Sequence, residues 1–253
     1  MKVLILCGGA GTRAYPLTRR MPKALMVVSG IPIVEQVMRI YASQGFNEFV
    51  LAVGYLKEDI QKYFKHHNRW QVECIDTGDT TDTGDRVRRC LPLLGDTFHA
   101  TYCDGLGDID LRRLVSFHRQ HGNSATLTAA PLRSQYGVLH ADEEDRITRF
   151  VEKPTLPEYW INAGFFVFDR RAIVTTEGDN LERDILPELS RRRALHAYRH
   201  HGFWRSMDTH KDQLELDSLW SPFSERLDVH EPVENDLPRW LLRRTAVASR
   251  SLS

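Results

Sequence analysis

Short runs of apolar, mostly branched residues alternate along the chain with segments in which apolar residues recur at helical spacing. The runs predict strands near residues 2–7, 48–53, 98–103, 125–130 and 164–168. The helical spacing predicts helices over residues 33–43, 56–66 and 111–121. Alternating strands and helices are typical of an α/β sandwich whose central sheet is mainly parallel. In such a sheet, ligands bind beyond the carboxyl ends of the strands.

The pattern changes near Ser221, where the chain becomes polar, gains prolines and ends among arginines and small residues. We therefore predict one catalytic-type domain over residues 1–220 and a C-terminal tail over residues 221–253 that is docked or partly disordered. The chain has no internal repeat, and no hexapeptide periodicity of the kind that forms a β-helix.

Composition excludes several classes of partner. The 34 basic and 34 acidic residues cancel, so no overall field favours nucleic acid or an anionic membrane. The four cysteines are widely spaced without a CxxC pair, which predicts neither a disulfide framework nor a zinc site. The first apolar run is too short for a signal peptide, and no stretch approaches a membrane span. We expect a soluble, cytoplasmic protein that binds neither nucleic acid nor membrane.

Five of the 11 histidines lie close together in the sequence, in two groups: His66 with His67, and His196 with His200 and His201. Neither group has a cysteine or an acidic partner at the spacing of metal ligands. We predict that these side chains are exposed and have no catalytic role.

The first predicted strand ends in a glycine-rich loop, Gly8-Gly9-Ala10-Gly11-Thr12-Arg13. Glycine lets the main chain approach an anion closely, successive N–H groups can point at its oxygens, and Arg13 adds a forked cation. The loop therefore predicts nucleotide binding. A tight turn after an edge strand is the alternative for this segment taken alone.

Two common nucleotide motifs do not fit this loop. A P-loop needs Gly-Lys-Ser/Thr, which does not follow Gly11. The G-x-G-x-x-A spacing from Gly9 resembles a dinucleotide fingerprint, but Pro16 interrupts the helix that should follow, which leaves an NAD(P)-dependent oxidoreductase as a remote alternative. Instead, Pro22-Lys23 brings a second cation toward the loop, and Gly30-Ile31-Pro32-Ile33 opens a helix.

In this order, G-G-x-G-T-R, P-K and G-x-P-I resemble the opening of the sugar nucleotidyltransferases. Four later segments resemble further motifs of that family: a strand-end aspartate, E-K-P, N-x-G and a second aspartate, at residues 102–105, 151–154, 161–164 and 207–209. Within the family, the resemblance is closest to the glucose-1-phosphate cytidylyltransferases, through D-T-G at 76–78, T-G at 83–84 and G-F-W at 202–204. The resemblance implies a Rossmann-like fold and a homo-oligomer.

The resemblance also implies a reaction, in which a sugar 1-phosphate attacks a nucleoside triphosphate directly and releases pyrophosphate. Such a transfer depends on positioning and charge neutralisation. Asp104 and Asp208 would hold Mg²⁺ as cofactor. Arg13 would bind the departing phosphates, Lys23 would neutralise the α-phosphate, and Lys153 would bind the sugar phosphate. If the two aspartates lay more than about 10 Å apart, they could not share one ion.

The remaining site residues expected from the resemblance form three groups. The phosphate loop would use Gly11 and Thr12 together with Arg13. The base would meet main-chain groups and one hydroxyl at Gly8, Gly9, Gly78, Thr83 and Gly84. The sugar would be oriented by Tyr136, Gly137, Glu152 and Asn162, beside Lys153. CTP is the favoured nucleotide and glucose 1-phosphate the favoured sugar.

Some positions depart from the cytidylyltransferase pattern. Asp85 stands where T-G-G-R has its second glycine, Ile31 replaces a lysine, and the segment before the D-T-G motif is short. The alternatives are therefore a guanylyl-, uridylyl- or thymidylyltransferase, or an enzyme acting on another hexose or a cyclitol phosphate. A catalytically inactive regulatory homologue is a further alternative, although Arg13, Lys23 and both aspartates are present.

Overall fold

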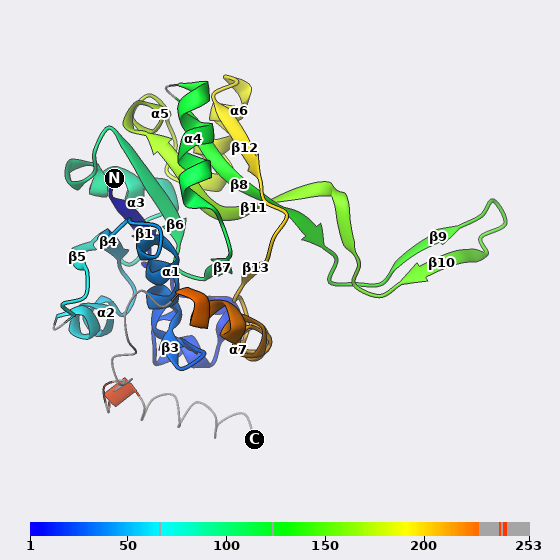
Figure 1. Ribbon diagram of the computed structural model, residues 1–253, viewed down its shortest axis with the longest axis horizontal. Helices are drawn as coiled ribbons and strands as arrows, with labels where there is room; N and C mark the ends of the chain where they lie inside the picture. The colour runs from blue at the N-terminus through cyan, green and yellow to red at the C-terminus, as the bar shows by residue number, and fades with distance from the viewer. Residues whose placement is uncertain (66, 123, 228–237, 239, 242–253) are drawn as a thin grey trace.

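The computed structural model of the 253-residue chain describes residues 1–65, 67–122, 124–227, 238 and 240–241. Its centre is a seven-stranded sheet covered by helices on both faces (Figure 1). The strands lie in the order β12 (Leu195–Arg199), β8 (Ala125–Arg133), β11 (Thr155–Asp169), β6 (Thr97–Tyr102), β1 (Val3–Leu6), β4 (Glu48–Val53) and β5 (Gln71–Asp76). Within this sheet only β11 runs antiparallel to its neighbours. The predicted mainly parallel α/β sandwich is confirmed.

The residues of strand β1 show why helices cover both faces of the sheet. Its four residues are all apolar, and their side chains alternate between the two faces of the sheet. Val3 and Ile5 belong to one buried cluster, and Leu4 and Leu6 belong to the other. Each face therefore needs its own cover of helices.

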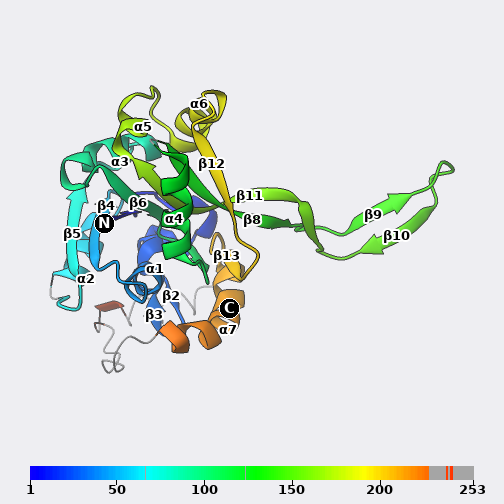
Figure 2. The same ribbon diagram turned by 45° about the horizontal axis from the view of Figure 1, so that its top comes forward.

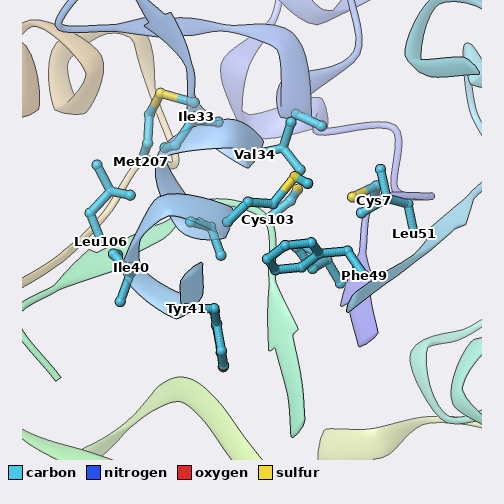
Figure 3. Close-up of a cluster of buried hydrophobic side chains, with 14 of the residues drawn as sticks. Cys7, Ile33, Val34, Ile40, Tyr41, Phe49, Leu51, Cys103, Leu106 and Met207 are labelled. Carbon is cyan, nitrogen blue, oxygen red and sulfur yellow. The ribbon is translucent and has the colours of Figure 1, made fainter. Parts of the chain in front are cut away.

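The first cluster packs under α1 (Ile33–Ala42), α2 (Lys57–Phe64), α4 (Leu111–His121) and α7 (His210–Ser224). Figure 3 shows side chains of α1 beside Phe49 and Leu51 of β4. The second cluster packs under α3 (Thr83–Cys90), α5 (Arg170–Val174), the π-helical turn η5 (Leu181–Ile185) and α6 (Leu186–Arg191).

All five predicted strands and all three predicted helices are present. The elements that the sequence pattern missed include β5, α3 and β12, for two physical reasons. Strands β5 and β12 are the sheet edges, so their side chains are partly exposed and the apolar signal is weak. Helix α3 has few apolar residues and buries Arg86, which an apolar periodicity cannot detect.

The connections that carry polar side chains contain short elements. Between β1 and α1 lie η1 (Thr12–Ala14), η2 (Leu17–Arg19), η3 (Lys23–Leu25) and the paired strands β2 (Val27–Val28) and β3 (Ile31–Pro32). Strand β7 (Gly105–Gly107) pairs antiparallel with β13 (Trp204–Ser206). Turn η4 (Leu91–Leu93) follows α3, and η6 (Glu225–Leu227) follows α7.

A two-stranded ribbon, β9 (Val138–Ala141) and β10 (Ile147–Val151), projects away from the body in both views (Figures 1 and 2). The register pairs Leu139 with Phe150 and Ala141 with Ile147, so these residues share one face. Leu139, Ile147 and Phe150 are more than half exposed. The ribbon thus presents an apolar face to solvent.

The predicted boundary at residue 220 falls inside α7, which continues to Ser224. Trp220 is buried in the first cluster, and so is Leu241, beyond the end of that helix. Of the tail expected over residues 221–253, residues 228–237, 239 and 242–253 lie outside the described residues. In the described part of the chain, no helix is both long enough and apolar enough to cross a membrane.

Candidate active site at the carboxyl ends of the strands

Several of the predicted site residues lie at one edge of the central sheet. Strands β1, β5 and β6 are parallel and lead directly into Cys7-Gly8, Thr77-Gly78 and Cys103-Asp104. Strand β11 runs the other way, and its Phe165 pairs with Thr101 near the end of β6, so Asn162, three residues earlier, lies at the same edge. The topology therefore joins segments that are far apart in the sequence.

Lys23 lies between the two predicted metal-binding aspartates. Its Nζ is 2.6 Å from Asp104 Oδ2 and 2.9 Å from Asp208 Oδ1. Lys23 is only 9% exposed. Burial lowers the pKa of Lys23, but attraction to Asp104 and hydrogen bonds to both carboxylates outweigh it, so the net pKa is raised. The ammonium therefore stays charged and is shared by the two carboxylates.

Backbone pairing holds Asp104 and Asp208 next to each other. Asp104 directly precedes β7 and Asp208 follows β13, and these two strands form one ribbon. The Met207 N–H donates to the Asp104 carbonyl at 2.9 Å, which extends the pairing to both aspartates. Lys23 enters from η3, directly after Pro22.

Arg13 makes a forked pair with Asp208. Its Nη1 donates to Oδ2 at 2.9 Å, and its Nη2 lies 2.9 Å from Oδ1. The Arg13 side chain is 72% exposed. The loop that carries it turns at Gly11, whose φ of 60° favours glycine and whose carbonyl accepts the Thr18 hydroxyl at 2.8 Å. Arg13 therefore faces solvent and is held to the site by Asp208.

The donor set is suitable for a divalent cation. The ammonium of Lys23, a cation, already lies between the two carboxylates, so they are far closer together than the limit of about 10 Å for a shared ion. Among the described residues, no group of three or more His, Cys, Asp or Glu could hold a metal. Magnesium, which prefers oxygen ligands and retains water, would thus take two carboxylates here and fill its other positions with phosphate and water.

Arg86, which the sequence reasoning did not select, organises the loops expected to meet the base. Its guanidinium is buried and donates to the carbonyls of Gly8, at 3.0 Å, and Gly78, at 2.8 Å, and to the Thr77 hydroxyl, at 2.5 Å. A Cβ at Gly8 would lie 1.9 Å from Arg86 Nη1. The arginine of the T-G-x-R motif was the available signal for this residue.

The start of α3 is tied to η5. The Thr83 hydroxyl donates to Glu182 Oε2 at 2.8 Å and accepts the Leu181 N–H at 2.9 Å. A Cβ at Gly84 would lie 2.6 Å from Ile185 Cδ1, so this glycine permits close packing. Glu182 is a second residue that the sequence reasoning missed, because nothing in its local sequence indicates its partners.

The residue that departs from the cytidylyltransferase pattern, Asp85, is engaged elsewhere. Its carboxylate pairs with Arg88 at 3.0 Å. Arg88 in turn donates to the carbonyls of Thr176 and Gly178. The Asp85 side chain therefore braces a loop on the α3 face of the sheet.

The residues expected to orient the sugar lie along β11 and at the root of the ribbon. The Asn162 carboxamide oxygen accepts the Gly164 N–H at 2.8 Å. Tyr136 is 80% exposed, and a Cβ at Gly137 would lie 3.1 Å from Glu152 Oε2. Lys153 Nζ lies 3.9 Å from Glu152 Oε1. The structure thus gathers four of these residues at the root and places Asn162 nearer the aspartates.

One prediction about the histidines is wrong. His200 is buried, because its Nε2 lies 3.0 Å from Asp108 Oδ1 and 3.1 Å from the Phe203 carbonyl and so finds polar partners inside the fold. His201 is exposed, whereas His67 and His196 are partly buried. His66 lies outside the described residues.

Comparison with known proteins gives consistent matches over this region. The model of the nucleotidyl transferase family matches residues 2–219. "Probable glucose-1-phosphate cytidylyltransferase" of Bacillus subtilis is 35% identical over 247 residues, covering 87% of this chain and 96% of that protein. Glucose-1-phosphate cytidylyltransferase of Salmonella typhi is 34% identical with the same coverage. The crystal structure of HddC from Yersinia pseudotuberculosis complexed with GMP-PN matches with a TM-score of 0.67 at 19% identity, covering 87% of this chain and 99% of that one. This match shows that the two proteins share a fold.

Proposed function

This chain belongs to the nucleotidyl transferase family, and from that premise we propose that it joins CTP and glucose 1-phosphate to form CDP-glucose and pyrophosphate. The observation that carries the proposal is the group of charges at the strand ends, in which Lys23 and Arg13 neutralise Asp104 and Asp208. The choice of CTP and glucose 1-phosphate is supported by the two cytidylyltransferases that match most of the chain.

The reaction brings two anions together, and this chain would contribute mainly charge and position. Arg13 is exposed, and its planar fork fits a phosphate as well as a carboxylate, so it can exchange Asp208 for the outer phosphates of the nucleotide. Lys23 is fixed and charged, and would lower the negative charge near the α-phosphate as the sugar phosphate attacks. Lys153, at the root of the ribbon, would bind the attacking phosphate.

Asp104 and Asp208 would hold Mg²⁺, and their arrangement around a cationic ammonium supports this assignment. When bound, Mg²⁺ supplies charge stabilisation for the transferred phosphate and the departing pyrophosphate. The glucose ring would be oriented by Asn162 and Glu152, with Tyr136 and Gly137 beside them.

The base would lie against the loops that Arg86 holds. The position of Asp85 is compatible with a cytidylyltransferase, because its carboxylate is paired with Arg88 and is not presented by the Gly8 or Gly78 loops. The replacement of the second glycine of T-G-G-R by Asp85 therefore leaves Arg86 hydrogen-bonded to the Gly8 loop and adds an ion pair with Arg88 on another side of α3.

The proposal is tested by pyrophosphate release with Mg²⁺, glucose 1-phosphate and CTP, UTP, GTP, dTTP or ATP in separate reactions. We expect release with CTP in clear excess over the other four, and none after chelation of the metal. Asp104→Asn should abolish release, whereas Asp85→Asn should retain it. Selective release with GTP, UTP or dTTP would keep the nucleotidyl transfer and overturn the choice of CTP. Release with CTP only after mannose 1-phosphate or a cyclitol phosphate replaces glucose 1-phosphate would overturn the choice of sugar.

A further inference from the structure

Glu182 joins two segments that the proposed function assigns to different parts of the reaction. Its carboxylate accepts one hydrogen bond from the Tyr102 phenol and a second from the Thr83 hydroxyl at 2.8 Å. Thr83 begins α3, beside the loops expected to meet the base. Tyr102 ends β6, two residues before Asp104. One side chain therefore touches both the nucleotide side and the catalytic strand.

The backbone around Glu182 is itself fixed. The Asn180 side chain accepts the N–H groups of Glu182 and Arg183 at 3.0 and 2.8 Å. The Leu181 N–H donates to the Thr83 hydroxyl at 2.9 Å. The Thr83 hydroxyl thus donates to Glu182 and accepts from its neighbour. This π-helical turn is the kind of irregularity that occurs often at functional sites.

Tyr102 also contacts the N-x-G segment of β11, which includes Asn162. Gly164 has a φ of +79°, and a Cβ there would lie 2.4 Å from Tyr102 Cδ2, so the phenol ring packs directly on the N-x-G turn. A hydrogen bond also joins the Tyr102 side chain to that of Asn162. The ring is therefore in contact with the residue expected to bind the sugar.

We propose that Glu182 is a positioning residue that couples the nucleotide subsite to the sugar-phosphate subsite, through Thr83 on one side and Tyr102 on the other. The proposal rests on the proposed function. A ligand that orders the Thr83 loop also orders Glu182, and through Tyr102 it orders the strand that carries Asp104 and the turn that carries Asn162. Each substrate then binds more tightly when the other is present, by the same factor in both directions.

The test measures affinity and turnover separately. The affinity of a non-hydrolysable CTP analogue is measured by calorimetry with and without saturating glucose 1-phosphate, and kcat and KM are measured for both substrates. In the wild-type protein, we expect glucose 1-phosphate to raise the affinity for the analogue by about 5-fold or more. Glu182→Ala should abolish this increase and lower kcat by about 10- to 100-fold, with much smaller changes in either KM.

Two further variants separate positioning from simple support of the fold. Glu182→Gln should recover part of kcat, because its amide oxygen still accepts one hydroxyl while its NH₂ cannot accept the other. Thr83→Val should lower kcat by a smaller factor in the Glu182→Ala background than in the wild-type background, because Glu182→Ala has already removed one of the contacts of Thr83. The matched control is Glu188→Gln, whose carboxylate pairs with Arg191 and Arg192 on the next helix and should leave kcat unchanged.

The outcomes of the two proposals differ. Absence of turnover with every pair of substrates overturns the proposed function. A wild-type protein in which glucose 1-phosphate does not change the affinity for the analogue overturns the inference. So does a Glu182→Ala variant with wild-type coupling, or one whose loss of kcat adds fully to that of Thr83→Val.

Discussion

Replacement of Lys23 by methionine would remove the charge between Asp104 and Asp208 while keeping a side chain of similar length. The ammonium is nearly buried and contacts both carboxylates at 2.6 and 2.9 Å. Two unit charges about 4 Å apart interact by about 4 kcal/mol at the effective dielectric near a protein surface, and these contacts are closer. Relief of the buried ammonium's desolvation offsets part of the loss, and the carboxylates are 21% and 26% exposed, which adds screening.

We therefore expect Lys23→Met to lower the free energy of unfolding by about 3 kcal/mol at low salt. For a chain of this size, that corresponds to a fall in Tm of about 6–12 °C. The assay is urea and thermal unfolding followed by circular dichroism, with and without MgCl₂. Because the variant leaves two adjacent carboxylates without their shared cation, Mg²⁺ should stabilise Lys23→Met more than the wild-type protein.

The matched control is Lys57→Met. Lys57 Nζ lies 2.7 Å from Asp76 Oδ2, but this pair is on the surface, where solvent screens it, so its loss should cost much less stability than the loss of Lys23. A double variant, Lys23→Met with Asp104→Asn, should recover part of the lost stability, because it removes one of the two repelling charges. If Lys23→Met unfolded at the same urea concentration as Lys57→Met, and Mg²⁺ acted equally on both, the interpretation of this group as a cation site would be refuted.

Two further predictions concern stability. Gly8→Ala would place a Cβ 1.9 Å from Arg86 Nη1 and should lower the free energy of unfolding by about 1–3 kcal/mol. The Cβ of Gly9→Ala would meet nothing within 4 Å, so the free energy of unfolding of this variant should stay within about 0.5 kcal/mol of the wild-type value. Equal urea midpoints for the two variants would contradict this prediction. Burial lowers the pKa of His99 to about 3, so the unfolded chain takes up a proton below pH of about 6.5 that the folded protein excludes. Stability should therefore fall as the pH drops from about 6.5 toward 3, by up to about 1.4 kcal/mol per pH unit from this group, and His99→Leu should reduce that slope in urea unfolding between pH 7 and 5.

Many of the central strands could be predicted, because a strand that is buried on both faces of the sheet tends to have a continuous run of apolar residues. Strand β1 is of this kind and runs straight into the motif at Gly8, whereas β6, which runs into Asp104, also buries the polar residues His99 and Thr101. Since parallel strands end at one edge of the sheet, the proximity of these motifs followed from their order alone. The closeness of Asp208 did not, because it depends on the pairing of β7 with β13 across nearly 100 residues.

The residues that the sequence did not reveal act through polar contacts at long range. Arg86 looks like a surface residue on a charged helix, yet its donors converge on carbonyls of two separate loops. Glu182 lies 99 positions from Thr83 and 80 from Tyr102, and no local pattern specifies either hydrogen bond. The ribbon was missed because its apolar face is exposed, so it lacks the burial that makes alternation informative.

The charges of the site imply that nucleotide and cation bind together. In the structure, Asp104 and Asp208 are balanced by Lys23 and Arg13, so the group carries no net charge. A triphosphate that took Arg13 would leave Asp208 with only a share of Lys23, and would bring several negative charges of its own. That arrangement is unfavourable unless another positive charge arrives with the nucleotide. Under the proposed function, the forked Arg13–Asp208 pair therefore favours the magnesium complex of the nucleotide over the free nucleotide, before any chemical step begins.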